Sequence, residues 1–178
     1  MKTKHCLLQG LLAVLLLSAS LQIQAQNNIN NLKIGPQPDG SILVPSNQLL
    51  RPAGFQLYMP GRPVDISLIS NERFLLVKNM NSLDLIQLND RSILQTLPYT
   101  KGGSSFTGIC SSKDNRRIYV SEASEKILIA RFDQSNVLSW EKPILMPKPA
   151  IGGDPGPGGL ALNAKEDRLY VTLSRNNS

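Results

Sequence analysis

Hydrophobic and polar residues follow the same pattern three times along this chain. Each copy has a short apolar run, then a polar turn, then a second apolar run. The two runs are separated by the same eleven positions each time, in the pairs Ile66 and Val77, Ile109 and Val120, and Leu160 and Val171. The runs are short and rich in Ile, Leu, Val and Tyr, which favours strands over helices. The pattern predicts three strand–turn–strand units.

Two more apolar runs follow in the first two copies. They predict third strands at 83–88 and 127–132, and fourth strands at 93–97 and 142–145. Nothing after residue 25 shows a sustained helical period. Four short strands in a unit of about 40 to 50 residues are typical of a β-propeller blade, and the fixed spacing argues against a generic β-sandwich. We therefore predict an all-β fold, a β-propeller of four-stranded blades, with repeats near residues 61–101, 104–150 and 156–178.

The last residues of each strand–turn–strand unit carry a family resemblance. They read Leu76-Val77-Lys78-Asn79, Tyr119-Val120-Ser121-Glu122 and Tyr170-Val171-Thr172-Leu173. Each is a degenerate form of Tyr-Val-Thr-Asn, so residues 52–178 resemble the YVTN-repeat β-propellers that some bacteria export. The resemblance implies a closed ring. We expect about two and a half blades here, as a fragment of a ring of about seven blades.

The N-terminus has the order of a secretory signal peptide. Residues 1–5 are basic, residues 6–17 are apolar, and small and polar residues follow up to Ala25. The apolar core is too short for a membrane helix, and Cys6 precedes it, which argues against a lipoprotein. We predict cleavage after Ala25, with residues 18–20 as the alternative site. The protein is then exported to the periplasm or outside the cell, with no stable membrane insertion.

Residues 26–51 are expected to form a leader segment before the propeller, which occupies residues 52–178. The stretch 32–60 is similar to the leader of exported bacterial propellers. Within it, residues 54–59 alternate Phe55, Leu57 and Met59 with polar neighbours. This alternation predicts one half-buried strand. We expect that strand to complete the last blade of the ring.

Charge and composition exclude several kinds of chemistry. Removal of residues 1–25 lowers the net charge from +6 to +4, and the remaining Lys and Arg form no cluster, so nucleic acid is not an expected partner. The only His is His5, which excludes His-based catalysis and His-ligated zinc after cleavage. Cys110 is then the single cysteine, and we expect a buried, inert thiol. No metal and no cofactor are expected.

The loops that join one blade to the next hold the candidate site. Arg62, Lys101 and Asp154 lie in such loops, and Asp65 lies on an inner strand. Arg62 and Lys101 favour an anionic ligand, and Asp154 is a candidate cation ligand. The alternative is that the glycines and prolines of 151–159 shape a purely structural turn. We expect the residues that follow the second strands, Asn79, Glu122 and Arg175, on the opposite edge.

Three functions remain open. The first is an exported binding module for a protein, a glycan or a small anionic ligand, with no catalysis in this chain. The second is the N-terminal propeller of a secreted, metal-dependent phosphoesterase whose catalytic domain follows Ser178. The third is a lactonase-like propeller enzyme, for which only Asp65 is suitably placed. Because many activities occur on propellers, the fold does not choose among them.

Overall fold

Every regular element that the structure describes is a β-strand. The computed structural model describes residues 32–99 and 103–175, and the all-β prediction is confirmed over this part of the chain. The chain forms two compact units, Met1–Gln56 and Leu57–Ser178. No described helix is long and apolar enough to cross a membrane. The predicted signal peptide, residues 1–25, lies outside the described residues.

The first unit contains a small antiparallel sheet. Its strands are β1 (Gly35–Pro36), β2 (Ile42–Leu43) and β3 (Leu49–Leu50), in that order. The Asp39 carboxylate accepts hydrogen bonds from the amide and hydroxyl of Ser41, which closes the turn between β1 and β2. These two hydrogen bonds lower the pKa of Asp39, and the bond from the Ser41 hydroxyl has the larger effect. The exposed ion pair of Asp39 with Arg51, at 3.5 Å, adds little to stability.

The first repeat folds as a four-stranded antiparallel sheet. Its strands follow chain order: β4 (Pro63–Ile69), β5 (Phe74–Asn79), β6 (Ser82–Gln87) and β7 (Ser92–Pro98). Ile66 and Val77, which stand eleven positions apart in the sequence pattern, face each other in the register of β4 and β5. The third and fourth strands of this repeat lie where the apolar runs predicted them.

The second repeat forms a similar sheet with a broken outer strand. Its strands are β8 (Ser104–Ser111), β9 (Arg117–Glu122), β10 (Lys126–Phe132), β11 (Leu138–Trp140) and β12 (Ile144–Leu145). Both β11 and β12 pair with β10. The predicted fourth strand at 142–145 is therefore only the second, shorter half of this edge. Pro143 has no backbone N–H, which explains why pairing stops between the two pieces.

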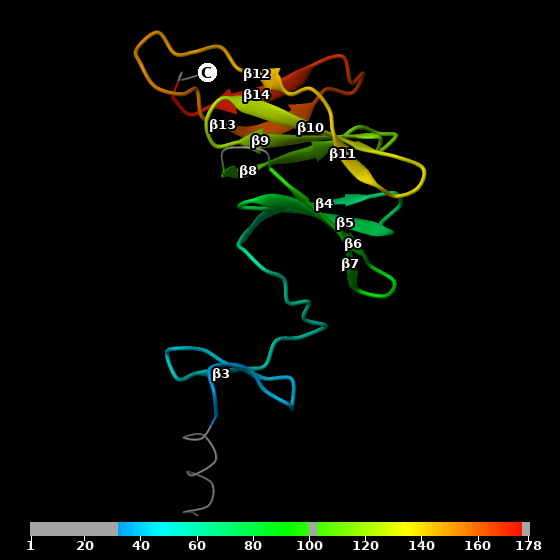
Figure 1. Cartoon of the computed structure of the whole chain (residues 1–178), viewed down its shortest axis with the longest axis vertical. Coiled ribbons are helices and arrows are strands. Elements are labelled where there is room, and N and C mark those ends of the chain that lie inside the picture. The colour runs from blue at the N-terminus through cyan, green and yellow to red at the C-terminus, as the bar shows by residue number, and fades with distance from the viewer. Residues whose placement is uncertain (1–31, 100–102, 176–178) are drawn as a thin grey trace, which may run out of the picture. The chain divides into compact units, whose positions relative to one another are not determined.

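The third repeat is a hairpin of β13 (Pro157–Leu162) and β14 (Leu169–Leu173). Within the second unit the hairpin, the second sheet and the first sheet lie one above another (Figure 1). Strand β8 contacts both β4 and β13, so the first strands of the three repeats are neighbours. This arrangement places the loops that precede these strands along one edge.

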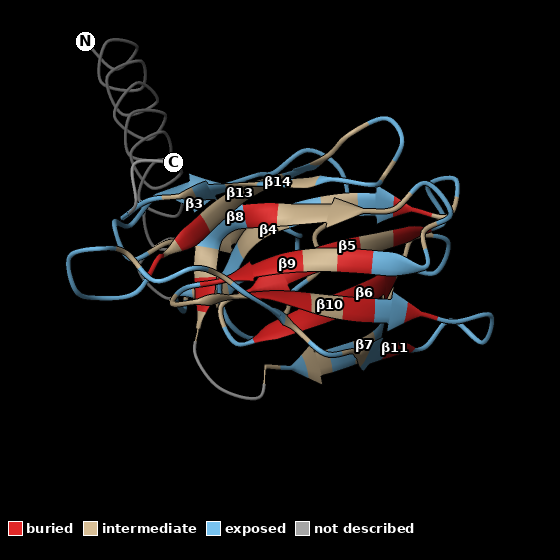
Figure 2. Cartoon of the chain, turned by 90° about the horizontal axis from the view of Figure 1, so that it is seen from above, coloured by how far each residue is buried: buried red, intermediate tan, exposed pale blue. Residues whose placement is uncertain are grey.

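The core lies between the first and second sheets. Figure 2 shows that the buried residues concentrate in the middle strands β5, β6, β9 and β10. Phe74 and Phe132 meet edge to face across the two sheets, with ring centroids 5.6 Å apart. The alternating apolar residues of both repeats therefore supply one shared core.

The strand predicted at residues 54–59 is absent. These residues have no regular structure, although Phe55, Leu57 and Met59 alternate as a strand would require. An extended segment becomes a strand only when a neighbour pairs with its backbone, and no described strand pairs with this one. The prediction that they form a strand is wrong for this structure.

Candidate functional site

The edge at which β4, β8 and β13 begin holds the predicted site residues that the structure describes, and we call it the loop edge. Arg62 directly precedes β4, and Asp154 lies three residues before β13. Asp65 is the third residue of β4. Lys101 lies outside the described residues. The structure thus places Arg62 and Asp154 in the connections that precede β4 and β13.

Asn79, Glu122 and Arg175 also lie at the loop edge, so the prediction that placed them on the opposite edge is wrong. Asn79 pairs with Pro63, and Glu122 pairs with Ser104. The Arg175 amide donates to the Pro155 carbonyl at 3.3 Å. In an antiparallel pair the second strand returns to the edge where the first began, so its last residues join the inter-sheet loops.

Arg62 covers an exposed aromatic ring at the loop edge. Its guanidinium carbon lies 5.2 Å from the ring centroid of Phe106 on β8, and this contact joins the first sheet to the second. Phe106 is 68% exposed, so much of the ring remains in contact with solvent. A guanidinium over an aromatic face is held by the negative potential of the ring. The pair offers a cation and an apolar surface side by side.

Asn79 fixes the loop that carries Arg62. Its side-chain oxygen accepts the amides of Arg62 at 2.6 Å and Met80 at 2.9 Å. Its side-chain nitrogen donates to the Pro60 carbonyl at 2.7 Å and to the buried Asp84 carboxylate at 3.2 Å. Both the oxygen and the nitrogen of the side-chain amide form hydrogen bonds, so Asn79 fixes the backbone position of Arg62.

Asp65 joins the first sheet to the second. Its carboxylate accepts the Gly108 amide at 2.8 Å and lies 3.4 Å from the Thr107 hydroxyl. Gly108 is buried, so its amide needs this acceptor. Asp65 therefore has a structural partner on β8, next to the strand position of Phe106.

Lys78 was missed by sequence reasoning, although it lies at the centre of the junction between the sheets. The side chain is 0% exposed. Its ammonium group donates to the Ser105 hydroxyl at 2.9 Å, the Ser121 hydroxyl at 3.0 Å and the Thr107 carbonyl. The alternation of Phe74, Leu76 and Lys78 on the core face of β5 was the available signal, because it places the lysine inside.

Burial makes the charge of Lys78 costly. Desolvation lowers the pKa of Lys78 from 10.5 to about 8, and the nearby negative charge of Asp65 opposes this change. Three hydrogen-bond acceptors satisfy the three N–H groups of the ammonium form. The polar atoms of Lys78 and Asp65 thus form hydrogen bonds that hold the two sheets together.

Asp154 is exposed in the glycine- and proline-rich loop before β13. Pro155 beside it is buried, and the Gly156 amide donates to the Ser124 carbonyl at 2.8 Å. These contacts attach the loop to the second sheet. In the described part of the chain, no hydrogen bond or ion pair joins Asp154 to Arg62 or Asp65. The structure therefore brings Arg62 and Asp65 against nearby residues of β8, Phe106 and Gly108, and leaves Asp154 apart.

Two other partly buried groups, the Cys110 thiol and the Tyr99 hydroxyl, have shifted pKa values. Burial raises the pKa of the Cys110 thiol to about 11, which keeps it protonated at neutral pH. Burial likewise raises the pKa of Tyr99 to about 12. Within residues 32–99 and 103–175, no group of three or more His, Cys, Asp or Glu is placed to hold a metal ion.

Comparison with known proteins gives information on the fold. No protein-family model and no curated protein matches the chain. A crystal structure of a functionally unknown protein from Desulfotomaculum acetoxidans is similar, with a TM-score of 0.54 and 22% sequence identity. The match covers 76% of this chain and 44% of that chain, so the present chain spans less than half the length of its structural neighbour.

Proposed function

We propose that residues 57–175 are part of a β-propeller in which each four-stranded sheet is one blade. Three features support this. Each sheet follows chain order from its first strand to its last. The first strands β4, β8 and β13 lie side by side. The third feature is that the loops which precede them share one edge, as propeller connections do. The hairpin of β13 and β14 matches the first two strands of such a blade.

We propose further that this propeller is an exported binding module, and that its loop edge binds a small ligand with a carboxylate beside an apolar ring or chain. The contact of Arg62 with the exposed ring of Phe106 carries this proposal. The guanidinium supplies a charge-assisted hydrogen-bond fork for an anion. The open part of the ring supplies a surface for the apolar part of the same ligand.

Binding is favoured over catalysis by how the neighbouring charges are used. The Asp65 carboxylate accepts a backbone amide, and the Lys78 ammonium group is enclosed by three acceptors. A general acid or base must reach the substrate by a hydrogen bond, and Lys78 is fully buried. The guanidinium of Arg62 carries only N–H donors, so it suits the binding of an anion rather than the abstraction of a proton.

The test is an NMR titration of the folded chain with two probes, benzoate and acetate. We expect both to shift the backbone amides of Phe106 to Gly108, and benzoate to bind more tightly by about fivefold because it also contacts the ring. Arg62→Gln should abolish both responses. Phe106→Leu should remove only the preference for benzoate.

Arg73→Gln is the matched control. Arg73 also lies over an aromatic ring, 5.3 Å from the centroid of Phe74, but that ring is only 2% exposed. Its loss should leave both titrations unchanged. If neither probe shifts these amides, or if Arg62→Gln binds benzoate as the wild type does, the loop edge is not the binding surface.

Export is the part of the proposal that rests on residues 1–25. If the signal peptide is cleaved as the sequence predicts, the protein recovered from the periplasm or the medium begins at Gln26. N-terminal sequencing of the secreted and the retained protein would decide this. Recovery of an intact Met1 terminus in the cytoplasm alone would contradict export.

A further inference from the structure

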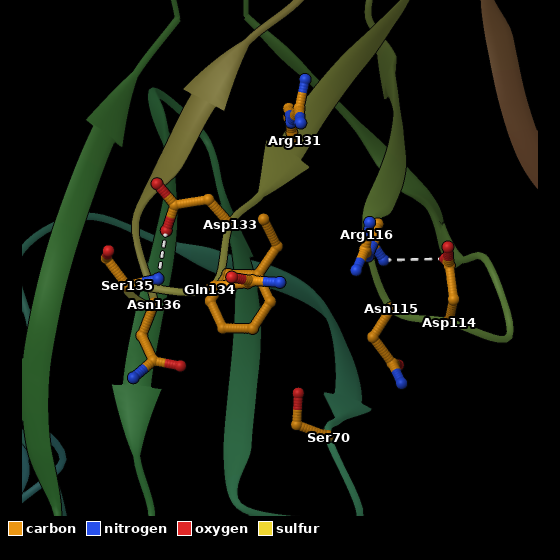
Figure 3. A pocket seen from close by; sticks show the side chains of 10 residues that line it. Ser70, Asp114, Asn115, Arg116, Arg131, Asp133, Gln134, Ser135 and Asn136 are labelled. Carbon is orange, nitrogen blue, oxygen red and sulfur yellow. Dashed lines mark hydrogen bonds between the residues drawn. The ribbon is translucent and has the colours of Figure 1, made fainter.

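A cavity of about 580 Å³ lies at the edge opposite the loop edge, between the turns of the first and second sheets. We call it the turn cavity. It is lined by Ser70 directly after β4, by residues 114–116 between β8 and β9, by Arg131 and Phe132 at the end of β10, and by residues 133–136 in the turn that follows. Figure 3 shows the polar side chains of both turns arranged around it. Its volume is in the range of small-molecule sites.

The charges of the turn cavity are balanced. Arg116 and Arg131 supply two positive groups, and Asp114 and Asp133 supply two negative groups. The Ser112 hydroxyl and then the Arg116 amide lower the pKa of Asp114 by hydrogen bonds, so this carboxylate is ionised at neutral pH. A ligand with a strong charge of either sign would meet two like charges in the lining.

The two carboxylates have one oxygen committed to the turns and one available. Oδ1 of Asp114 accepts the Ser112 hydroxyl and the Arg116 amide, and Oδ1 of Asp133 accepts the amides of Ser135 and Val137. The bonds of Asp114 to Arg116 and of Asp133 to Ser135 are drawn in Figure 3. Among the described residues no hydrogen bond reaches Oδ2 of either carboxylate. The turns therefore hold these acceptors rigidly at the cavity.

The guanidinium groups that line the cavity are also available to a ligand. Neither Arg116 nor Arg131 forms an ion pair with a described carboxylate, and the amides of Gln134 and Asn136 add further donors and acceptors. Phe132 also lines the cavity and contributes apolar surface. Adjacent hydroxyl groups are the chemistry that suits such a mixed lining, because each hydroxyl donates to a carboxylate and accepts from a guanidinium or an amide.

We propose that the turn cavity is a binding site for a neutral saccharide. Its balanced charges, rigid carboxylates and open guanidinium groups match a ligand with many hydroxyl groups and no net charge. This site is separate from the loop edge and does not depend on Arg62.

The test is calorimetric titration of the folded chain with maltotriose, cellotriose and chitotriose. We expect at least one of them to bind with a Kd of about 1 mM or below. Arg116→Ala and Arg131→Ala should each weaken that binding by about tenfold, the loss of one charged hydrogen bond. Neither residue has an ion pair to lose, so the thermal unfolding of both variants should match the wild type.

Arg168→Ala is the matched control, because Arg168 lies in the turn before β14 and outside the cavity. It removes the same charge and should leave saccharide binding unchanged. The proposal is overturned if none of the three trisaccharides binds, or if Arg116→Ala binds them as tightly as Arg168→Ala. Citrate and Ca²⁺ are the charged probes. The proposal would also be overturned if citrate bound more tightly than every saccharide and Arg116→Ala lost that binding. The same holds if Ca²⁺ bound more tightly than every saccharide and Asp133→Asn lost that binding.

Discussion

The first and second repeats join their neighbours in two different ways. Between the first sheet and the second, polar side chains span the junction: Asp65 reaches Gly108, and Lys78 reaches Ser121. Gly108 occupies in the second repeat the position that Asp65 has in the first, and Ser121 likewise corresponds to Lys78. Between the second sheet and the hairpin, backbones approach directly. A Cβ at Gly108 would collide with the Gly158 carbonyl oxygen and the Ser121 hydroxyl.

The difference shows how one repeat geometry is satisfied by unlike residues. The first repeat has Asp65 and Lys78 where the second has Gly108 and Ser121. Long side chains can adjust when one atom is replaced, whereas a contact between backbones leaves no room for an added atom. The junction made by side chains should therefore tolerate conservative change, and the junction made by glycine should not.

Gly108→Ala should have the largest effect. Gly108 has a φ of 100°, which L-residues rarely adopt, and the new methyl group would meet a backbone oxygen that cannot move aside. We expect a loss of about 3 kcal/mol or more in the free energy of unfolding. Urea unfolding followed by the fluorescence of Trp140, the single tryptophan, measures it.

Gly103→Ala is the control for that experiment. Its nearest atom to a new Cβ is the Met80 carbonyl oxygen at 3.9 Å, an ordinary contact. It should change the free energy of unfolding by less than about 1 kcal/mol. If Gly108→Ala were as mild as Gly103→Ala, the close backbone junction would not exist.

Lys78→Met should have a smaller effect that depends on pH. The folded state lowers the pKa of Lys78 to about 8, whereas the unfolded chain keeps it near 10.5. Between these values the unfolded state binds the extra proton, so wild-type stability rises with pH across this window. We expect the wild type to gain about 2 kcal/mol relative to Lys78→Met between pH 8 and 10.

At neutral pH, Lys78→Met should change stability by only about 1 kcal/mol. The three acceptors are already linked to one another, because the Ser105 and Ser121 hydroxyls bond each other and the Thr107 carbonyl. Urea unfolding of both proteins at several pH values gives the difference. A pH-independent difference would show that the lysine is not desolvated in the folded protein.

Substitution of Asp65 should have a smaller effect than Gly108→Ala. Asp65→Ala leaves the buried Gly108 amide without an acceptor, which costs about 1 to 2 kcal/mol. Asp65→Asn keeps an acceptor oxygen and should cost less, by about 1 kcal/mol. Chemical unfolding of the two variants compares them directly. Equal losses would mean that the charge of Asp65, rather than its hydrogen bond to Gly108, holds the junction.

Regular strands could be predicted because their signal is local. In β4, Val64, Ile66 and Leu68 alternate with Asp65 and Ser67, which is the two-residue period of a strand. The same local signal failed at residues 54–59, where the alternation is present but no partner strand is described. It also missed β11, since Leu138–Trp140 is too short to show a period.

The candidate site could be predicted only to its edge. Arg62 was found because it stands in a loop before a first strand. Its partner Phe106 was not, since the two are separated along the chain and meet only when β4 and β8 lie side by side. The turn cavity gave no sequence signal, because its two turns become neighbours only through the pairing of β8, β9 and β10.

The sequence by itself determined the all-β character and the strand–turn–strand units at 63–79, 104–122 and 157–173. Each of these depends on residues close together in the chain. The tertiary structure alone decided that Lys78 is buried between Ser105 and Ser121, that Asp65 serves Gly108, and that charged turns enclose a cavity. These contacts join residues more than twenty-five positions apart, and only the packing of one sheet on the next brings them within hydrogen-bonding distance.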